Sequence, residues 1–141
     1  MISLFKQNTP TGRLISLYVA TFGGSVEQNL LDYNDLVNKN YGGSDNTHNV
    51  RPWNRIPVTP GSKLVMTCDL AVTEFDVRFY DENGTYDSSD TYAEYNDLTV
   101  SCEFTVPDYC VSILPKWYRT GTELLVDELI AANPVIKYVR E

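Results

Sequence analysis

The sequence predicts an all-β fold, an antiparallel β-sandwich of jelly-roll type with about eight strands and at most one or two short helices. Several runs of roughly seven to ten residues alternate apolar and polar side chains, as strands with one buried face do. Turn-forming residues separate these runs at short intervals, which is typical of sandwiches and barrels. One polar face per strand favours antiparallel over parallel sheets.

The alternation is clearest from residue 63 onward. The predicted strands are KLVMTCDLAV (63–72), FDVRFYD (75–81), DLTVSCEFTVP (97–107) and YCVSILPKWY (109–118). In these strands the side chains expected to face inward are Leu64, Met66, Cys68, Leu70, Phe75, Val77, Phe79, Leu98, Val100, Cys102, Phe104, Val106, Val111 and Ile113. Side chains at the intervening positions, such as Asp76, Arg78 and Tyr80, are expected on the opposite face.

Two dipeptides predict turns next to these strands. Pro60-Gly61 ends the segment IPVTPG, and Asn83-Gly84 follows the strand FDVRFYD. Both Asn and Gly tolerate a positive φ, which a tight hairpin turn of the primed type requires. The acidic stretch after residue 80 is therefore expected to be the solvated end of a hairpin.

The N-terminal third is less regular. RLISLYVATF (13–22) alternates and predicts a strand, or two short strands around Gly23-Gly24. Residues 25–43 have only a weak helical spacing. Residues 41–55 are rich in Gly, Asn, Asp and Pro, which predicts a loop.

The C-terminal segment GTELLVDELIAANPVIKYVRE has two interpretations. Thr122 is a candidate N-cap for a helix from Glu123 to Ala132 that ends before Pro134. The same stretch could instead form a strand. In either case VIKYVRE is expected to form a final strand.

The composition is that of a single globular domain. The chain has 141 residues, of which 43% are hydrophobic and 21% are charged. A chain of this size buries roughly 70% of its unfolded surface, so it needs no metal or disulfide to fold. We expect one domain over residues 1–141, with the sandwich core at 55–118. Residues 1–54 would form a strand and loop region that can act as a docking arm, and 119–141 a helix or strand followed by the last strand.

The charge of the chain argues against nucleic acid and anionic membranes as partners. The net charge is −8, and only 11 residues are basic, whereas phosphate backbones are bound through Lys and Arg. No signal peptide is recognisable, and no apolar run approaches the roughly 20 residues that span a bilayer. The chain is therefore expected to be made in the cytoplasm.

No catalytic constellation is visible. The single histidine, His48, lies in the polar loop, and nothing indicates that it meets a nucleophile. The three cysteines, Cys68, Cys102 and Cys110, have no CxxC spacing and are predicted to be free thiols. We therefore predict no catalytic residue, no metal ligand and no cofactor.

Acidic residues are frequent after residue 80. They are Asp81, Glu82, Asp87, Asp90, Glu94 and Asp97. A sugar hydrolase needs two carboxyl groups that face each other across a cleft, and abundance alone does not indicate such a pair. Asp81, Asn83 and Asp87 alternate as in a calcium loop, but Tyr92 stands where the bidentate acid belongs. Solvated acids on a hairpin are the favoured interpretation.

Aromatic residues are the best candidates for a ligand-binding surface, since the chain has 10 tyrosines. The candidates are Trp53, Tyr80, Tyr86, Tyr92, Tyr95, Trp117 and Tyr118. Aromatic faces stack on sugar rings, and neighbouring acids and amides accept hydroxyl protons. The same residues would equally suit a protein–protein contact, or could be half-buried residues without a binding role.

The segments IPVTPGSKL, FDVRFYDENGTY and FTVPDYCVSI occur in an order that resembles a known family. They are similar to the carbohydrate-binding-module-like β-sandwich (jelly-roll) domains on tail and head appendage proteins of tailed bacteriophages. The matching positions are 56–61, 77–84 and 104–107, and the resemblance covers roughly residues 55–115. Its motifs are strand and turn features, so it carries over no sugar-binding residue.

The resemblance implies a non-enzymatic structural protein of a virion. It would be an auxiliary head or tail subunit, displayed on the particle surface, with other virion proteins and a cell-surface glycan as partners. Such subunits assemble around symmetry axes, so a homo-oligomer is expected. Two alternatives stay open: a free-standing carbohydrate-binding module, and a small polysaccharide hydrolase.

Overall fold

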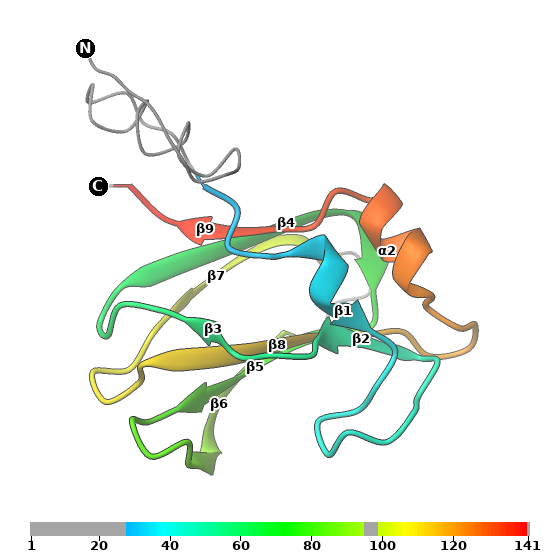
Figure 1. The fold of residues 1–141 in the computed structure, drawn as a ribbon. Coiled ribbons are helices and arrows are strands. Elements are labelled where there is room, and N and C mark those ends of the chain that lie inside the picture. Colours follow the sequence, from blue (N-terminus) through cyan, green and yellow to red (C-terminus); the bar gives the residue numbers. More distant parts are fainter. Residues whose placement is uncertain (1–27, 95–98, 141) are drawn as a thin grey trace, which may run out of the picture.

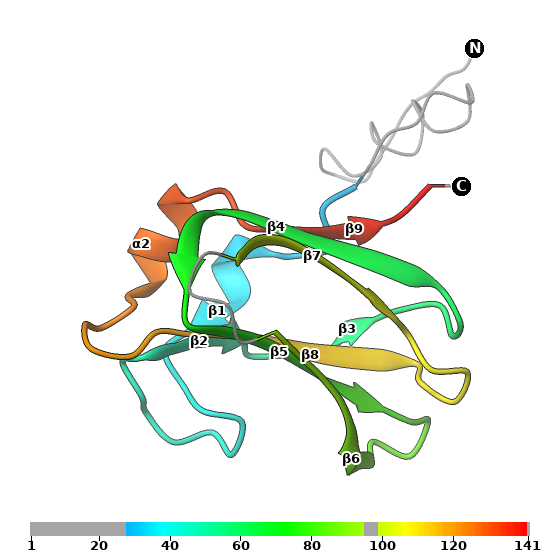
Figure 2. The same cartoon turned by 180° about the vertical axis from the view of Figure 1, so that it is seen from behind.

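A computed structural model describes residues 28–94 and 99–140 and contains two antiparallel sheets packed face to face (Figures 1 and 2). The larger sheet has the strand order β1-β2-β8-β5-β6, with β3 also paired to β8, and the smaller sheet has the order β7-β4-β9. The predicted all-β antiparallel sandwich is confirmed; the jelly-roll type stays a prediction.

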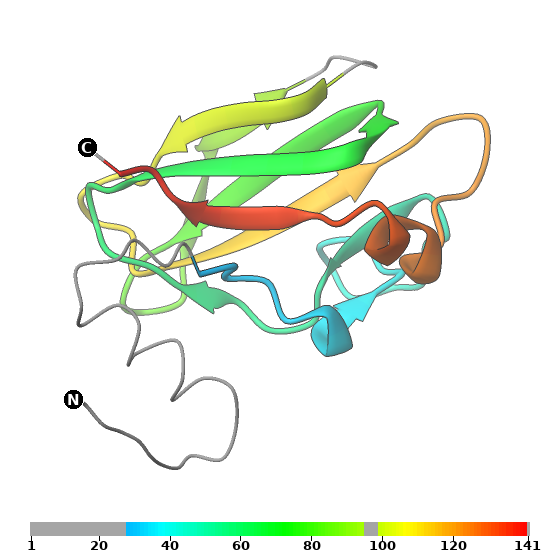
Figure 3. The same cartoon turned by 90° about the horizontal axis from the view of Figure 1, so that it is seen from above.

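The strands are short at the N-terminal end and longer in the centre of the chain. They are β1 (Leu36–Val37), β2 (Asn49–Pro52), β3 (Ile56–Pro57), β4 (Lys63–Val72), β5 (Glu74–Tyr80), β6 (Tyr86–Glu94), β7 (Thr99–Thr105), β8 (Ser112–Tyr118) and β9 (Val135–Tyr138). The helices are a 3-10 turn, η1 (Tyr33–Asp35), and α2 (Val126–Ala131). Figure 3, seen from above, shows β9 beside β4, and α2 at one end of the sandwich.

The hydrophobic core lies between the two sheets. The Phe75 ring of β5 lies 5.1 Å from Trp117 of β8 in the same sheet and 6.1 Å from Phe104 of β7 in the other sheet. Leu64 and Met66 of β4 are fully buried against this cluster. The alternation of apolar residues thus places one face of β4, β5, β7 and β8 in the core, as predicted, whereas most of β6 is exposed.

Most of the predicted strands are confirmed, including β4 with its predicted bounds 63–72. The inward orientation of Val111 was predicted wrongly, because 40% of its surface is exposed. Val111 lies just before β8, where its backbone bonds to Val58 and Tyr80. The predicted strand 13–22, residue Leu98 and the side chain of Val100 lie outside what the structure describes.

The loop predicted for residues 41–55 is wrong in part. Residues 49–52 form β2, which pairs with β8 and places Val50 in the core. The weak helical spacing of residues 25–43 corresponds, in its described part, only to η1 followed by β1. Long-range pairing with β8 therefore overrides the loop-like composition of this segment.

The two predicted turns differ in outcome. The Pro60-Gly61 turn is confirmed, with Gly61 at φ 78°. After β5, only Gly84 has a positive φ (76°), so the predicted primed turn with Asn83 also at positive φ is wrong. The Asp81 carboxylate accepts the backbone N–H groups of Asn83 (2.9 Å) and Thr85 (3.0 Å). The loop 81–85 between β5 and β6 then needs the left-handed conformation only at Gly84.

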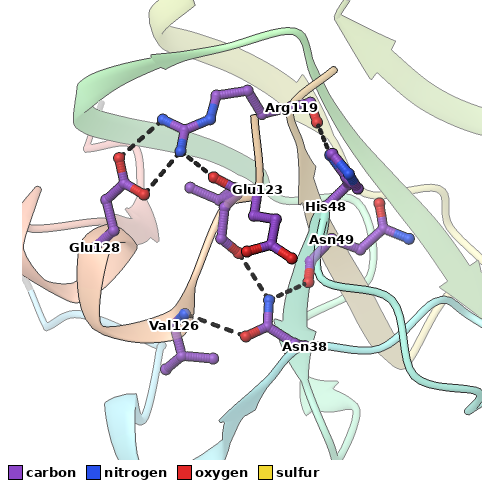
Figure 4. Close-up of polar contacts among 8 residues, drawn as sticks. Asn38, His48, Asn49, Arg119, Glu123, Val126 and Glu128 are labelled. Atoms are coloured by element: carbon purple, nitrogen blue, oxygen red, sulfur yellow. Dashed lines mark hydrogen bonds and ion pairs between the residues drawn. The ribbon is translucent and has the colours of Figure 1, made fainter. Parts of the chain in front are cut away.

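The predicted C-terminal helix and strand are confirmed as α2 and β9, but the predicted cap is wrong. The N-cap of α2 is Leu125, not Thr122, and it makes no side-chain capping bond. Instead the Oδ1 of Asn38 accepts the backbone N–H of Val126 at 3.3 Å (Figure 4). A residue remote in sequence therefore satisfies the start of the helix.

Candidate functional site

Two groups of polar side chains stand out, and the first holds the α2 end of the sandwich together (Figure 4). The Asn38 amide donates to the carbonyl oxygens of Asn49 (2.8 Å) and Leu124 (2.7 Å). Arg119 forms a two-pronged ion pair with Glu128, at 2.9 and 2.7 Å. We call these residues, together with His48 and Val126, the α2 network.

Most polar groups of the α2 network are bonded to one another, although the buried Asn49 Oδ1 and Arg119 Nε have no hydrogen-bond partner within the described part of the chain. The His48 Nδ1 lies 2.9 Å from the carbonyl oxygen of Arg119, and the Arg119 guanidinium also donates to the Glu123 carbonyl oxygen. His48 therefore joins two loops, and no nucleophile is bonded to its ring among the described residues. The α2 network is best explained as a structural element.

The second group lies on the outer face of the larger sheet, away from the core. Glu74, Asp76 and Arg78 alternate with the buried residues of β5, so they point to this face. In the sheet, Asp76 pairs with Lys116 of β8 on one side and with Ala93 of β6 on the other. Residues from three strands thus share one surface.

This surface is hollowed into a pocket. Figures 1 and 2 show that β6 and the loop 38–48 both extend from the larger sheet on the side away from β4, β7 and β9. The pocket between them has a volume of about 290 Å³. Its lining residues are Tyr41, Glu74, Asp76, Arg78, Tyr86, Ser88, Thr91, Ala93 and Lys116, and we call it the outer-face pocket.

The floor of the outer-face pocket contains a pair of carboxyl groups. Glu74 is hydrogen bonded to Asp76, and this bond, burial and the charge of Asp76 raise the pKa of Glu74 to about 7. The Tyr41 hydroxyl donates to Asp76, and the Lys116 ammonium lies 3.8 Å from the Asp76 carboxylate. Burial and the neighbouring Asp76 raise the pKa of Tyr41 well above its usual value. Glu74 therefore keeps its proton to a higher pH than an ordinary carboxyl group.

Arg78 is held between two aromatic rings. Its guanidinium carbon lies 3.9 Å from the centroid of the Tyr41 ring and 4.1 Å from that of the Tyr86 ring. The Lys116 ammonium also lies over the Tyr41 ring, at 4.6 Å. These distances are within the range of cation–π attraction, roughly 6 Å.

Three of the predicted ligand-binding residues share the outer face. Tyr86 lines the outer-face pocket. Tyr80 pairs with Tyr86 across the hairpin and is mostly buried, with its ring 5.4 Å from that of Tyr86. Tyr118 pairs with Glu74 and is half-buried. Strand alternation therefore brings Tyr80, Tyr86 and Tyr118 to the same face of the sheet.

The other predicted aromatic residues lie elsewhere. Trp117 is fully buried beside Phe75, so its ring has no face for a ligand and we withdraw it from the predicted surface. Tyr92 also faces the core, where its ring stacks on Phe104 at 5.2 Å. Trp53 is 52% exposed but does not line the pocket. Tyr95 lies outside the described residues.

Sequence reasoning missed most of the pocket. It proposed none of Tyr41, Glu74, Asp76, Arg78 and Lys116 as binding residues. The alternation of β5 could have found Asp76 and Arg78, because it places them on the face of Tyr80. No comparable signal marks Tyr41, which reaches the pocket through the loop 38–48.

The acidic hairpin is not organised as a metal site. Asp81 directs its carboxylate to the backbone of its own turn, and hydrogen bonds from Ser89 lower the pKa of Asp87. Among residues 28–94 and 99–140, no three His, Cys, Asp or Glu side chains are grouped to hold a metal ion. The cysteines Cys68, Cys102 and Cys110 are free thiols.

Comparison with known proteins adds no family to these observations. No protein-family model matches the chain, and no curated protein is similar to it. In the part of the chain that the structure describes, no helix is long and apolar enough to cross a membrane. Function has to be inferred from the pocket.

Proposed function

We propose that this protein is a non-enzymatic subunit that binds carbohydrate in the outer-face pocket and is displayed on the surface of a tailed-phage virion. The observation that carries the binding role is the pocket itself. It combines tyrosine rings, hydroxyl groups, carboxyl groups and cations in one hollow on a sheet. The virion location is supported by the resemblance to phage appendage domains.

The chemistry of the pocket suits sugar hydroxyl groups, which both donate and accept hydrogen bonds. Asp76 and Glu74 supply acceptors, Lys116 supplies donors, and Ser88 and Thr91 supply both. Sites for apolar small molecules are instead lined mainly by hydrophobic residues. The volume of about 290 Å³ lies near the lower end of the range for small-molecule sites, roughly 300–1,000 Å³. A single sugar unit, not a long chain, is the expected occupant.

The carboxyl pair argues for binding and against hydrolysis. Glycoside hydrolases place their two carboxyl groups about 5–5.5 Å apart, or about 6.5–9.5 Å apart, so that a sugar or water fits between them. The pKa of Glu74 is raised mainly by a hydrogen bond to Asp76. A hydrogen-bonded pair is closer together than either of these spacings, which disfavours the hydrolase alternative.

A small pocket of this kind is expected to bind one sugar unit weakly. Many copies on one particle would raise the overall avidity without new contacts. A homo-oligomer assembled with other virion proteins would provide that repetition. A free-standing carbohydrate-binding module would bind the same sugars but would lack the multiplicity.

Glycan-array binding of the full-length protein tests the proposal. We expect saturable binding that is lost in Thr91→Trp, which fills the pocket from an exposed position on β6. Trp53→Ala is the matched control, because Trp53 is exposed and lies outside the pocket. Thermal unfolding of each variant checks the fold. Absence of any glycan binding, or binding lost only in Trp53→Ala, would reject the pocket as the sugar site.

The virion location needs a separate measurement. The chain should co-sediment with phage particles through a density gradient and appear in many copies per particle by quantitative mass spectrometry. A chain found only in the unbound protein fraction would favour the free-standing binding module.

A further inference from the structure

Building on the proposed sugar-binding role, we propose that the outer-face pocket selects sugars that carry a carboxylate, and that Arg78 binds this carboxylate. Uronic acids and sialic acids are sugars of this class. Three observations on Arg78 support the assignment: how its guanidinium is held, which groups it contacts, and how its neighbours are occupied.

The guanidinium of Arg78 lies close to two aromatic rings. Its carbon is 3.9 Å from the centroid of the Tyr41 ring and 4.1 Å from that of the Tyr86 ring. Cation–π contacts do not use up the N–H donors of the guanidinium, which it can offer to a ligand. These N–H groups form a planar fork that matches the two oxygens of a carboxylate. Holding the fork in place before binding lowers the entropy lost when a ligand binds.

The N–H groups of Arg78 make no hydrogen bond within the part of the chain that the structure describes. Among the described residues, Arg78 makes cation–π contacts but no hydrogen bond and no ion pair. The other pocket cation, Lys116, is already placed beside Asp76, at 3.8 Å. Arg78 therefore carries a positive charge that is in no ion pair among the described residues.

Two other arginines show what a structural arginine looks like in this chain. Arg119 is paired with Glu128, and Arg51 donates to the carbonyl oxygens of Asn40, Pro52 and Trp53. Both use their N–H groups to connect parts of the backbone. Arg78 has the same N–H donors and lines a pocket. Its donors are therefore available to a ligand.

The test compares two matched probes, an oligosaccharide ending in glucuronic acid and its carboxyl-reduced counterpart ending in glucose. Binding of each to the full-length protein is measured by titration calorimetry. We expect the acidic probe to bind about tenfold more tightly or better, since a charged hydrogen-bonded pair contributes that much. Arg78→Gln should remove this preference, so that the acidic and the neutral probe bind the variant with equal affinity.

Two further variants make the result specific. Arg78→Lys keeps the charge but loses the planar fork, so it should retain only part of the preference. Arg140→Gln makes the same charge change on an exposed residue after β9, in the other sheet, and should change nothing. Unfolding curves establish that each variant is folded. If Arg78→Gln does not fold, a reduced preference for the acidic probe in Arg78→Lys tests the proposal.

The outcomes separate this inference from the proposed function. Equal binding of the two probes, or a preference that survives in Arg78→Gln, overturns the role of Arg78 while sugar binding stands. Binding of neither probe, with no binding on the wider glycan array, overturns both.

Discussion

The α2 network and the outer-face pocket use the same kinds of residue in opposite ways. In the α2 network the Arg119 guanidinium is paired with Glu128, and Asn38 uses both ends of its amide. In the outer-face pocket the Arg78 guanidinium contacts only aromatic rings among the described residues. The Glu74 carboxyl group is hydrogen bonded to that of Asp76. The first arrangement connects α2 to the larger sheet, whereas the second leaves the Arg78 N–H groups without a hydrogen bond among the described residues.

The carboxyl groups of the two regions show the same contrast in their pKa values. Hydrogen bonds from Arg119 lower the pKa of Glu128, whereas the bond to Asp76, together with burial, raises the pKa of Glu74 to about 7. A lowered pKa means that the folded protein favours the charged form, and a raised pKa means that it disfavours it. Functional sites are where such unfavourable arrangements are retained.

The largest effect on stability is expected in the α2 network. Asn38→Ala removes bonds to Asn49, Leu124 and Val126 and leaves partly buried backbone groups without partners. We expect the free energy of unfolding to fall by about 2–3 kcal/mol, measured by chemical denaturation. Asn34→Ala, at an exposed position, is the control and should change stability by less than about 0.5 kcal/mol. Equal effects of the two variants would remove the structural role of the α2 network.

Glu74→Gln should abolish a pH dependence of stability that comes from the outer-face pocket. Since the folded-state pKa of Glu74 is raised from 4.5 to about 7, the folded state holds a proton that the unfolded state releases. The wild-type free energy of unfolding should therefore fall as pH rises from about 4.5 to about 7, by on the order of 1 kcal/mol after solvent screening.

Denaturation curves of wild type and Glu74→Gln at several pH values measure this difference. Asp87→Asn, on the exposed hairpin, should leave the pH dependence between about 4.5 and about 7 intact. If the free energy of unfolding depended on pH in the same way in wild type and Glu74→Gln, Asp76 would not raise the pKa of Glu74.

Glu128→Gln should have the smallest effect on the free energy of unfolding. The effect should depend on pH in the opposite direction to that of Glu74→Gln. Arg119 lowers the pKa of Glu128 in the folded state, so its contribution is present above the ordinary carboxyl pKa and is lost as pH falls through it. Because the Glu128 side chain is 44% exposed, we expect a loss of about 0.5 kcal/mol at pH 7. Denaturation at low pH should show no difference from wild type. A difference that persists there would indicate a contribution from packing in place of charge.

Local patterns in the sequence were sufficient for the long strands. The bounds of β4 and the outward position of Asp76, Arg78 and Tyr80 on β5 follow from alternation, because a strand turns successive side chains to opposite faces. After Pro134 a final strand was expected from the apolar run, whereas both a helix and a strand stayed open for the stretch before it. These features depend on neighbours within a few residues.

The tertiary structure alone decided the parts that depend on distant residues. It placed β2 beside β8, Asn38 on the first turn of α2 across 88 residues, and Tyr41 over Asp76 across 35 residues. It also decided that Trp117 faces the core while Tyr86 faces the pocket. A hydrogen bond or ring contact between residues so far apart leaves no periodic trace in either segment. The fold class could therefore be predicted from the sequence, whereas the pocket became visible only when the loop 38–48 was placed against β5 and β6.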